Sequence, residues 1–307
     1  KYRFPAGTRI APAGYLWIDE AAFNADTNNP ASFRLDSTGD AIWLFAAGPA
    51  GELLGYAHGF SFGAAQNGVS FGREITCEGD ERFLPQRAVT PAQANAGPLE
   101  PALVITEIHY HPPDLAVGAD TWNDTAFEFI ELANTSRSPL PLFDPAHTTN
   151  RWILKDAVRF TFPPDTVLPD GGIALVVNFD PGNNPLARAS FLRAFNVPPG
   201  VPLFGPFSGS LPNNNARIEL ARPDTPQLPP APDAGFVPYV NVDAVTYSDD
   251  PPWPKAADGQ GLSLQRVGLS GLSDRPGAWI AASPTPGRLP DPGQDTDGDG
   301  LPDAWES

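Results

Sequence analysis

The most specific pattern of chemically active side chains in this 307-residue sequence lies near its C-terminal end. Acidic residues recur there on alternate positions, as in a calcium-binding loop; the candidate ligands are Asp295, Asp297, Asp299, Leu301, Asp303 and Glu306. Calcium takes about six to eight oxygen ligands. The aspartates supply carboxylates, Leu301 supplies its backbone carbonyl, and Glu306 is placed to bind through both carboxylate oxygens. We therefore predict calcium as the cofactor, the alternative being a solvated acidic tail.

A second motif, Gly68–Gly72, fits the Gly-x-Ser-x-Gly turn that presents a nucleophilic serine in α/β-hydrolases. That turn requires a parallel sheet with a helix packed behind the serine. The residues that follow, EITCEGDERF, have no helical apolar face. We expect Ser70 to be a strand residue and not a nucleophile.

Two pairs of ionisable residues have the spacing of potential sites. His109 and His111 lie two apart on a predicted strand, so they share a face that could hold zinc or copper together with Glu107. Metal sites need further ligands, which favours a polar strand face instead. Glu128 and Glu131 are candidates for a carboxylate pair, but their odd separation places them on opposite faces of a regular strand. We expect exposed or turn-capping acids.

Trp253 and Cys77 complete the candidates. Trp253 lies in a loop rich in Asp and Pro and could stack on a sugar ring, although packing within a sandwich is the more common role of tryptophan. Cys77 precedes acidic residues that raise a thiol pKa, so we expect it to be unreactive. As the only cysteine, it excludes an internal disulfide framework.

The composition restricts the class of protein. Hydrophobic residues make up 41% of the chain and charged residues 18%, while 29 glycines and 38 prolines indicate many turns. The length corresponds to about two domains. A net charge of −17 repels phosphate backbones, so we expect no nucleic-acid partner. Because no stretch approaches about 18 uncharged apolar residues, we expect no membrane insertion.

Short strands separated by turns dominate the pattern. The predicted strands are Leu103–Tyr110, Phe127–Leu132, Ile173–Val177, Ala216–Leu220 and Val240–Tyr247. Prolines interrupt most windows long enough for a helix, and the best short helix candidate is Ser190–Asn196. This spacing predicts an all-β fold of the β-sandwich type.

Four stretches recur in the same order along the chain, which indicates two tandem copies of one module joined around residues 96–101. The matches are Lys1–Ile18 with Val158–Val176, Thr38–Leu44 with Asn214–Leu220, Gly68–Arg73 with Gly261–Arg266, and Thr90–Pro91 with Thr285–Pro286. The second copy is complete. The first lacks a counterpart of residues 101–157, so we expect the natural protein to be longer or a partner to supply these strands.

The second copy also carries an ordered set of family signals. They are Ile105–Ile108, Glu128–Asn134, Trp152–Phe162, Phe207–Asn213, Asp243–Tyr247, Trp253–Pro254, Asp258–Gly259, Gly261–Arg266, Trp279 and Thr285–Gly287. This set resembles the lamin tail domain, the immunoglobulin-like module of nuclear lamins that also occurs in bacterial surface and secreted proteins. The resemblance covers residues 100–290 fully and 1–98 in part. The acidic loop resembles the calcium linkers of thrombospondin type 3 repeats.

The resemblance implies tandem immunoglobulin-like β-sandwiches of the lamin-tail type, with the first copy N-terminally incomplete. The expected domains are residues 1–98, 99–290 and an acidic calcium-binding linker, 291–307. It further implies a non-catalytic structural or adhesion protein at the bacterial cell surface or outside the cell, assembling into filaments or a surface layer.

Unpaired strand edges in the first copy would recruit strands, so the expected partners are other copies of the chain or neighbouring domains of the same polypeptide. The alternative function is a glycan- or ligand-binding accessory region of a larger secreted enzyme. An enzyme in its own right is disfavoured, because no nucleophile, base and orienting group converge in the sequence.

Overall fold

The computed structural model describes residues 1–26, 28–76, 79–117, 120–229 and 233–289. The chain divides into two compact units. Unit 1 comprises Lys1–Glu100 and Asp224–Val240, and unit 2 comprises Pro101–Pro223 and the described residues from Asn241 onward. The regular secondary structure of both units is mainly antiparallel β-strand, which confirms the predicted all-β class.

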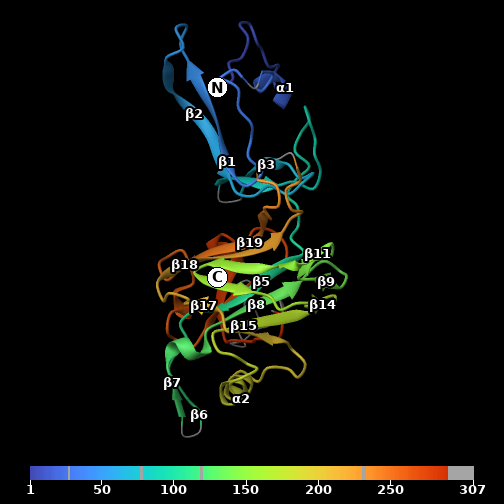
Figure 1. The fold of residues 1–307 in the computed structure, drawn as a ribbon. Helices are drawn as coiled ribbons and strands as arrows, with labels where there is room; N and C mark the ends of the chain where they lie inside the picture. The colour runs from blue at the N-terminus through green and yellow to red at the C-terminus, as the bar shows by residue number, and fades with distance from the viewer. Residues whose placement is uncertain (27, 77–78, 118–119, 230–232, 290–307) are drawn as a thin grey trace. The chain divides into compact units, whose positions relative to one another are not determined.

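Unit 1 contains two small sheets, each a single antiparallel strand pair. Its elements are α1 (Glu20–Phe23), β1 (Asp40–Ala47), β2 (Leu53–Phe62), β3 (Phe71–Ile75) and β4 (Glu81–Pro85). Figure 1 shows β1 and β2 as a long hairpin. The short helix α1 begins where the side chain of Asp19 accepts a hydrogen bond from the backbone N–H of Ala22.

Unit 2 is a β-sandwich of two larger sheets. The first has the strand order β16 (Leu203–Phe204), β15 (Ile173–Val177), β8 (Phe129–Asn134), β5 (Leu103–His109), β20 (Ser263–Arg266) and β21 (Trp279–Ala282). The second has the order β17 (Ser208–Gly209), β13 (Val158–Thr161), β12 (Ile153–Asp156), β18 (Asn215–Pro223) and β19 (Tyr239–Ser248). Every neighbouring pair for which the register is given is antiparallel except β15 with β16.

Shorter elements connect these strands. They are β6 (Leu115–Val117), β7 (Asp120–Trp122), η1 (Asp124–Phe127), β9 (Leu140–Pro141), β10 (Phe143–Asp144), β11 (His147–Arg151), β14 (Val167–Leu168), α2 (Pro185–Ala194), η2 (Lys255–Ala257) and η3 (Pro276–Ala278). The helix α2 begins at a proline after Asn184, whose side chain caps the backbone N–H of Ala187.

The core of unit 2 lies between its two sheets. Alternate residues of β18, such as Ile218 and Leu220, point into it together with Leu264 of β20 and Trp279 of β21. A second apolar cluster on the other face of the first sheet joins Phe129 and Leu175 to helix α2. Strands β5 and β8 are therefore covered on both faces, which explains their nearly continuous apolar sequences.

The predicted strands of unit 2 are confirmed, with shifted ends. Strand β8 begins at Phe129, two residues later than predicted, because Asp124–Phe127 forms a 3-10 helix. The helix predicted over Ser190–Asn196 lies within a longer span, since α2 begins at Pro185.

Two of the four repeated stretches have the same strand pairing in both units. Arg73 lies opposite Phe83 in the β3–β4 ladder, and its match Arg266 lies opposite Trp279 in the β20–β21 ladder. β1 likewise pairs with β2, as its match β18 pairs with β19. The repeated sequences thus form equivalent strand pairs.

The first repeated stretch behaves differently in the two units. Lys1–Ile18 contains no strand, whereas its match includes β13, β14 and part of β15. In unit 2, β13 pairs with β12, and β15 pairs with β8. Both partner strands lie in the region that has no counterpart within residues 1–100, so Lys1–Ile18 has no equivalent ladder to join.

Candidate functional site

The inner face of unit 1 is only partly covered. β1 and β2 present Ile42, Leu44, Phe60 and Phe62 on one side, because residues directly opposite one another in an antiparallel pair share a face. Two of these rings contact the facing sheet, as the Phe60 ring stacks on Phe83 at a centroid distance of 3.9 Å and Phe62 lies 5.6 Å from Phe71. Unit 1 is therefore a half-sandwich with a small aromatic contact layer.

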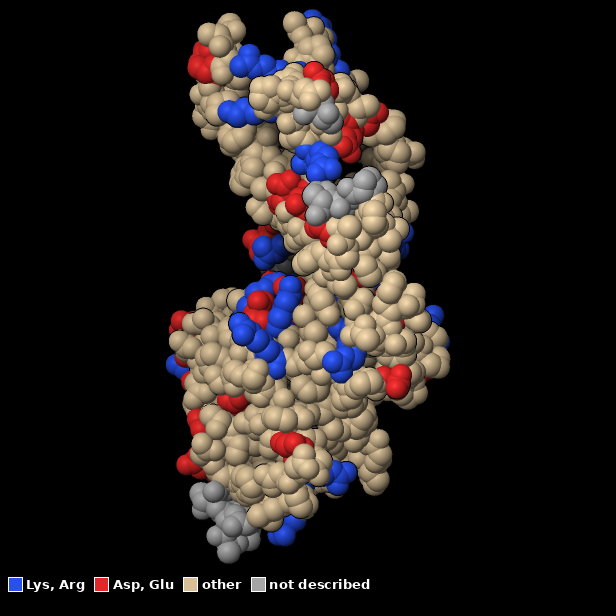
Figure 2. All heavy atoms as spheres, in the orientation of Figure 1, with Lys and Arg blue, Asp and Glu red and all other residues tan. Residues whose placement is uncertain are grey.

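Matching positions have opposite exposure in the two units. Ile42 and Leu44 are 42% and 46% exposed, whereas their matches Ile218 and Leu220 are 0% exposed. Among the described residues of the range 1–100, no hydrophobic side chain is buried. On the face shown in Figure 2, most of the molecular surface is neither acidic nor basic. The exposed aliphatic side chains of β1 thus correspond to core positions of a complete sandwich.

The strand edges beside these residues are also open. β1 pairs only with β2, and β3 pairs only with β4, among the described residues. Their matches in unit 2 each have two neighbours: β18 lies between β12 and β19, and β20 lies between β5 and β21. An edge strand presents unpaired backbone N–H and C=O groups, so β1 and β3 can accept an additional strand.

A polar cluster lies between the two sheets of unit 1. His58 of β2 contacts Glu81 of β4 through Nε2, at 2.9 and 3.0 Å from the two carboxylate oxygens. Arg73 of β3 donates from Nε to the same carboxylate. The hydrogen bond from Arg73, followed by that from His58, lowers the pKa of Glu81 and keeps it ionised.

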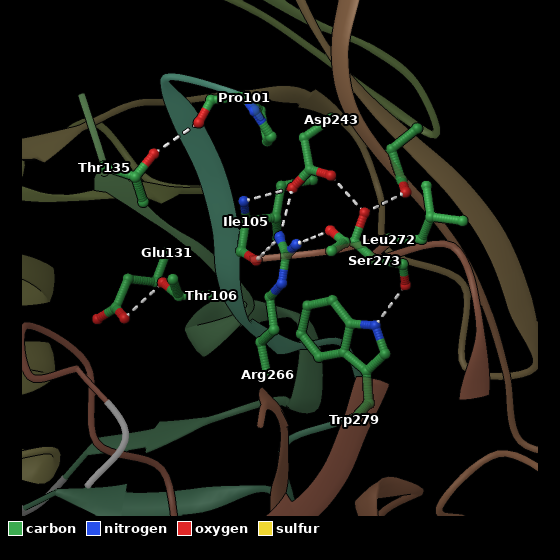
Figure 3. A network of polar contacts seen from close by, with 12 residues as sticks. Pro101, Ile105, Thr106, Glu131, Thr135, Asp243, Arg266, Leu272, Ser273 and Trp279 are labelled. Atoms are coloured by element: carbon green, nitrogen blue, oxygen red, sulfur yellow. Dashed lines mark hydrogen bonds and ion pairs between the residues drawn. The ribbon is translucent and has the colours of Figure 1, made fainter. Parts of the chain in front are cut away.

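The matching place in unit 2 holds a buried ion pair. Arg266 of β20 donates from Nη1 to Oδ2 of Asp243 on β19, at 2.9 Å, as Figure 3 shows. Burial raises the pKa of Asp243, while Arg266, the Ser273 hydroxyl and backbone N–H groups oppose that shift. The pair joins the two sheets at one end of the core.

The predicted calcium ligands Asp295, Asp297, Asp299, Leu301, Asp303 and Glu306 lie outside the described residues. Cys77 also lies outside them. Within the part of the chain that the structure describes, no three His, Cys, Asp or Glu side chains are arranged to hold a metal ion.

Ser70 lies directly before β3, and its carbonyl accepts a hydrogen bond from the backbone N–H of Gln86 at 2.8 Å. A strand, and not the helix of a nucleophile elbow, follows the serine. Ser70 thus extends the pairing between the two strands of this sheet by one residue beyond β3.

The two histidines do not form the expected common strand face. β5 ends at His109, whose ring packs edge-on against Phe129 and Phe195, with neither ring nitrogen hydrogen-bonded among the described residues. Burial, and to a lesser degree His111, lowers the pKa of His109 to about 3. His111 lies beyond the strand, and its Nδ1 lies 2.5 Å from Asp258. The alternation that predicted a shared face ends with the strand.

Glu128 and Glu131 are buried, so the expectation of exposed acids is wrong. Glu128 accepts a hydrogen bond from the backbone N–H of Leu211, and burial raises its pKa to about 8. Glu131 lies directly opposite Glu107 across the β5–β8 ladder. Burial is the main cause of the raised pKa values of both, and the charge of Glu131 adds to the shift of Glu107.

Backbone groups of a C-terminal segment explain how these two carboxyl groups are covered. The N–H of Thr285 donates to Glu107 at 3.0 Å, and the N–H of Gly287 donates to Glu131 at 2.6 Å. The segment therefore covers the two carboxyl groups and donates hydrogen bonds to them. These contacts cannot be predicted from the residue types of the strands.

Trp253 has the packing role that is the more common one for tryptophan, whereas Trp43 is exposed. Trp253 packs against the core of unit 2 and is partly buried. Trp43 of β1 is 53% exposed and lies on the outer face, opposite Gly59. A Cβ added to Gly59 would lie 2.1 Å from the carbonyl oxygen of Ile42 and 2.9 Å from the Trp43 ring, so only glycine fits beneath the indole.

No family model, curated protein or solved structure matches the chain. In the described part of the chain, no helix has the length and apolar character needed to cross a membrane. The open inner face and strand edges of unit 1 are the candidate site.

Proposed function

We propose that this chain is a non-catalytic structural protein of the cell surface or extracellular space. In this proposal its two units are copies of one immunoglobulin-like module of the lamin-tail type. The first copy is completed by a β-strand from outside residues 1–100, and this strand addition builds filaments or a surface layer. The observation that carries the proposal is the exposure of Ile42 and Leu44 at positions whose matches in unit 2 are core residues.

The energetic reason is that a half-sandwich leaves both apolar area and backbone groups unsatisfied. Burying one aliphatic side chain contributes roughly 1.5–3 kcal/mol. Strand addition at β1 and β3 would bury Ile42 and Leu44 and pair the free backbone groups in a single step. A head-to-tail contact of this kind does not close on itself and therefore propagates into a fibre.

The proposal also gives a role to the acidic residues near the C-terminal end of the sequence. The acidic loop at residues 295–306 binds calcium through the ligands predicted above. Such linkers suit the calcium-rich exterior of the cell, and the net charge of −17 keeps the chain away from anionic surfaces.

The test is the assembly state of the 307-residue chain by sedimentation velocity over a range of concentrations. A lysine-flanked peptide with the sequence of residues 101–110 is added in parallel, because those residues include β5, which pairs with the match of β3 in unit 2. We expect concentration-dependent assembly or uptake of the peptide, lost in Leu44→Asp on the inner face. The matched control Ala41→Asp, on the outer face of the same strand, should retain it. A chain that remains monomeric and takes up no peptide contradicts the proposal.

A second candidate, a glycan-binding accessory region, is favoured by Trp43. Its exposed ring lies across Gly59 on the outer face, which addition of strands to the inner face would not cover. A flat exposed indole stacks well on the apolar face of a sugar. Retention on insoluble polysaccharide that Trp43→Ala abolishes would support this role over assembly.

A further inference from the structure

We propose that Arg73, Glu81 and His58 form a binding site for the main chain of the strand that completes unit 1. This inference rests on the proposed strand addition and specifies how the strand is held. The ligand class is the backbone of an antiparallel β-strand, bound at one residue through its N–H and C=O groups.

The precedent is the ion pair of unit 2, which binds the backbone of β5. Asp243 accepts a hydrogen bond from the N–H of Ile105 at 2.8 Å, and Arg266 donates to the C=O of the same residue at 3.4 Å. Figure 3 shows both side chains directed at this one residue of the neighbouring strand. The two side chains thus hold β5 by its main chain.

Asp243 and Arg266, here called the clamp, contact β5 just beyond the ladder that β5 forms with β20. β20 pairs with β5 at Ile108 and Glu107, and the ladder between these two strands ends before it reaches Ile105. Side-chain groups of Asp243 and Arg266 satisfy the backbone of Ile105, which would otherwise be buried and unpaired.

The register of the strands places the cluster of unit 1 at the same position. Arg73 matches Arg266 because each lies opposite the aromatic residue of the following strand, as described above. The N–H of Asp249 donates to the C=O of Asn214, and Asn214 matches Thr38. That hydrogen bond sets the register in which Leu220 of β18 lies opposite Asp243 of β19. In the β1–β2 ladder the matching Leu44 lies opposite His58, so His58 occupies the position of Asp243.

The chemistry of the clamp is retained with one exchange. Histidine replaces the aspartate of β19, and Glu81 supplies the carboxylate from β4 instead. A guanidinium has five N–H donors, of which Glu81 engages the one on Nε. Among the described residues, the two terminal nitrogens of Arg73 have no hydrogen-bond partner, so donors for a strand carbonyl are available.

Exposure separates the occupied site from the open one. The side chains of Arg266 and Asp243 are 1% and 6% exposed, whereas those of Arg73 and Glu81 are 54% and 32% exposed. Unit 2 buries its pair beneath β5, and the corresponding edge of β3 in unit 1 is unpaired among the described residues. This difference in side-chain exposure is expected if the site in unit 2 is occupied by a strand and the site in unit 1 is not.

The experiment measures binding of the lysine-flanked 101–110 peptide to the 307-residue chain by fluorescence anisotropy. We expect Arg73→Met to weaken binding about tenfold, the loss of one or two hydrogen bonds to a charged group. Arg82→Met is the matched control, since Arg82 alternates with Glu81 and Phe83 on β4 and points to the other face. It should bind as the unsubstituted chain does.

A second peptide tests the backbone contact itself. Replacing the amide at the Ile105 position by an ester removes the N–H from which the carboxylate would accept a hydrogen bond. We expect the ester to weaken binding several-fold to the unsubstituted chain but not to Glu81→Leu, which has no acceptor. A merely structural role for Glu81 would not produce this coupling.

The outcomes separate this inference from the proposed function. If Arg73→Met binds the peptide normally while Leu44→Asp does not, the clamp is wrong and strand addition stands. If the ester costs the same affinity in both chains, the carboxylate contact is wrong. If the unsubstituted chain neither binds peptide nor assembles, both proposals fail.

Discussion

Ile42 and Ile218 occupy matching positions in equivalent strand pairs, yet one is 42% exposed and the other fully buried. The same contrast holds for Leu44 with Leu220 and for Arg73 with Arg266. The local sequences and pairings are alike, so the difference lies in the strands that surround them. Unit 2 provides β5, β8 and β12, which residues 1–100 do not.

In this module, strands pair locally even where no closed core forms between the sheets. The β1–β2 and β3–β4 hairpins form without the strands that flank their matches in unit 2. Most of the free energy of a sandwich comes from burial between complete sheets. Unit 1 should accordingly contribute little to the stability of the chain until a strand is added.

The largest expected difference concerns the matching arginines. Arg266→Met leaves Asp243 buried without a partner, so we expect a loss of about 3–5 kcal/mol in the free energy of unfolding of unit 2. Arg73→Met removes a half-exposed side chain and should change it by less than about 0.5 kcal/mol. Urea unfolding followed by tryptophan fluorescence measures both. Equal losses would contradict the contrast between the units.

The matching leucines test the same contrast in the core. Leu220→Ala creates a cavity between two sheets and should cost about 2–5 kcal/mol. Leu44→Ala truncates an exposed side chain and should cost less than about 1 kcal/mol in the absence of an added strand. Both values come from urea midpoints at equal protein concentration. A large loss from Leu44→Ala would mean that unit 1 already has a closed core.

A third difference is the response to pH. Glu128 has a pKa raised by burial to about 8, so its neutral form is favoured in the folded state. Its contribution to stability is full below the unfolded pKa near 4.5 and is lost as the pH rises through about 8. We expect unit 2 to lose about 1–3 kcal/mol between pH 5 and pH 8.5.

Glu128→Gln should reduce this slope, because a neutral amide can still accept from the N–H of Leu211. Glu107 and Glu131 act in the same direction, so part of the slope should remain. Urea midpoints across the pH range provide the measurement. Stability that rises toward pH 8.5 would show that these carboxyl groups are ionised in the fold.

The smallest expected effect belongs to the acidic tail. Glu306→Gln removes the proposed bidentate ligand and should weaken calcium binding by about tenfold or more. Titration calorimetry of the full chain measures it, and Glu100→Gln serves as a control outside the loop. If calcium produces no heat of binding with the unsubstituted chain, the proposed calcium site is wrong.

Much of unit 2 could be predicted from sequence because its strands are short, regular and separated by turns. Ile173–Val177 forms β15 with the predicted bounds. Its continuous apolar run reflects a strand covered on both faces, a property carried by the segment itself.

The site in unit 1 could not be predicted in the same way. His58 and Glu81 are 23 residues apart and meet only when two sheets face each other. The repeated GVSFGR and GLSLQR stretches did mark Arg73 and Arg266 as equivalent, but not what they contact. The burial of Glu107 and Glu131 could not be predicted because the segment that covers them, residues 285–287, lies far from β5 and β8 in sequence.

Hydrogen exchange of the backbone amides in β1 and β3 measures whether these strands have open edges in the chain alone. The account predicts rapid exchange in both strands of the chain alone and slow exchange in their matches β18 and β20. Addition of the 101–110 peptide, or assembly at high concentration, should slow exchange in β1 and β3 and leave β18 and β20 unchanged. Slow exchange in β1 and β3 of the monomeric chain, with no change on adding the peptide, would contradict the account.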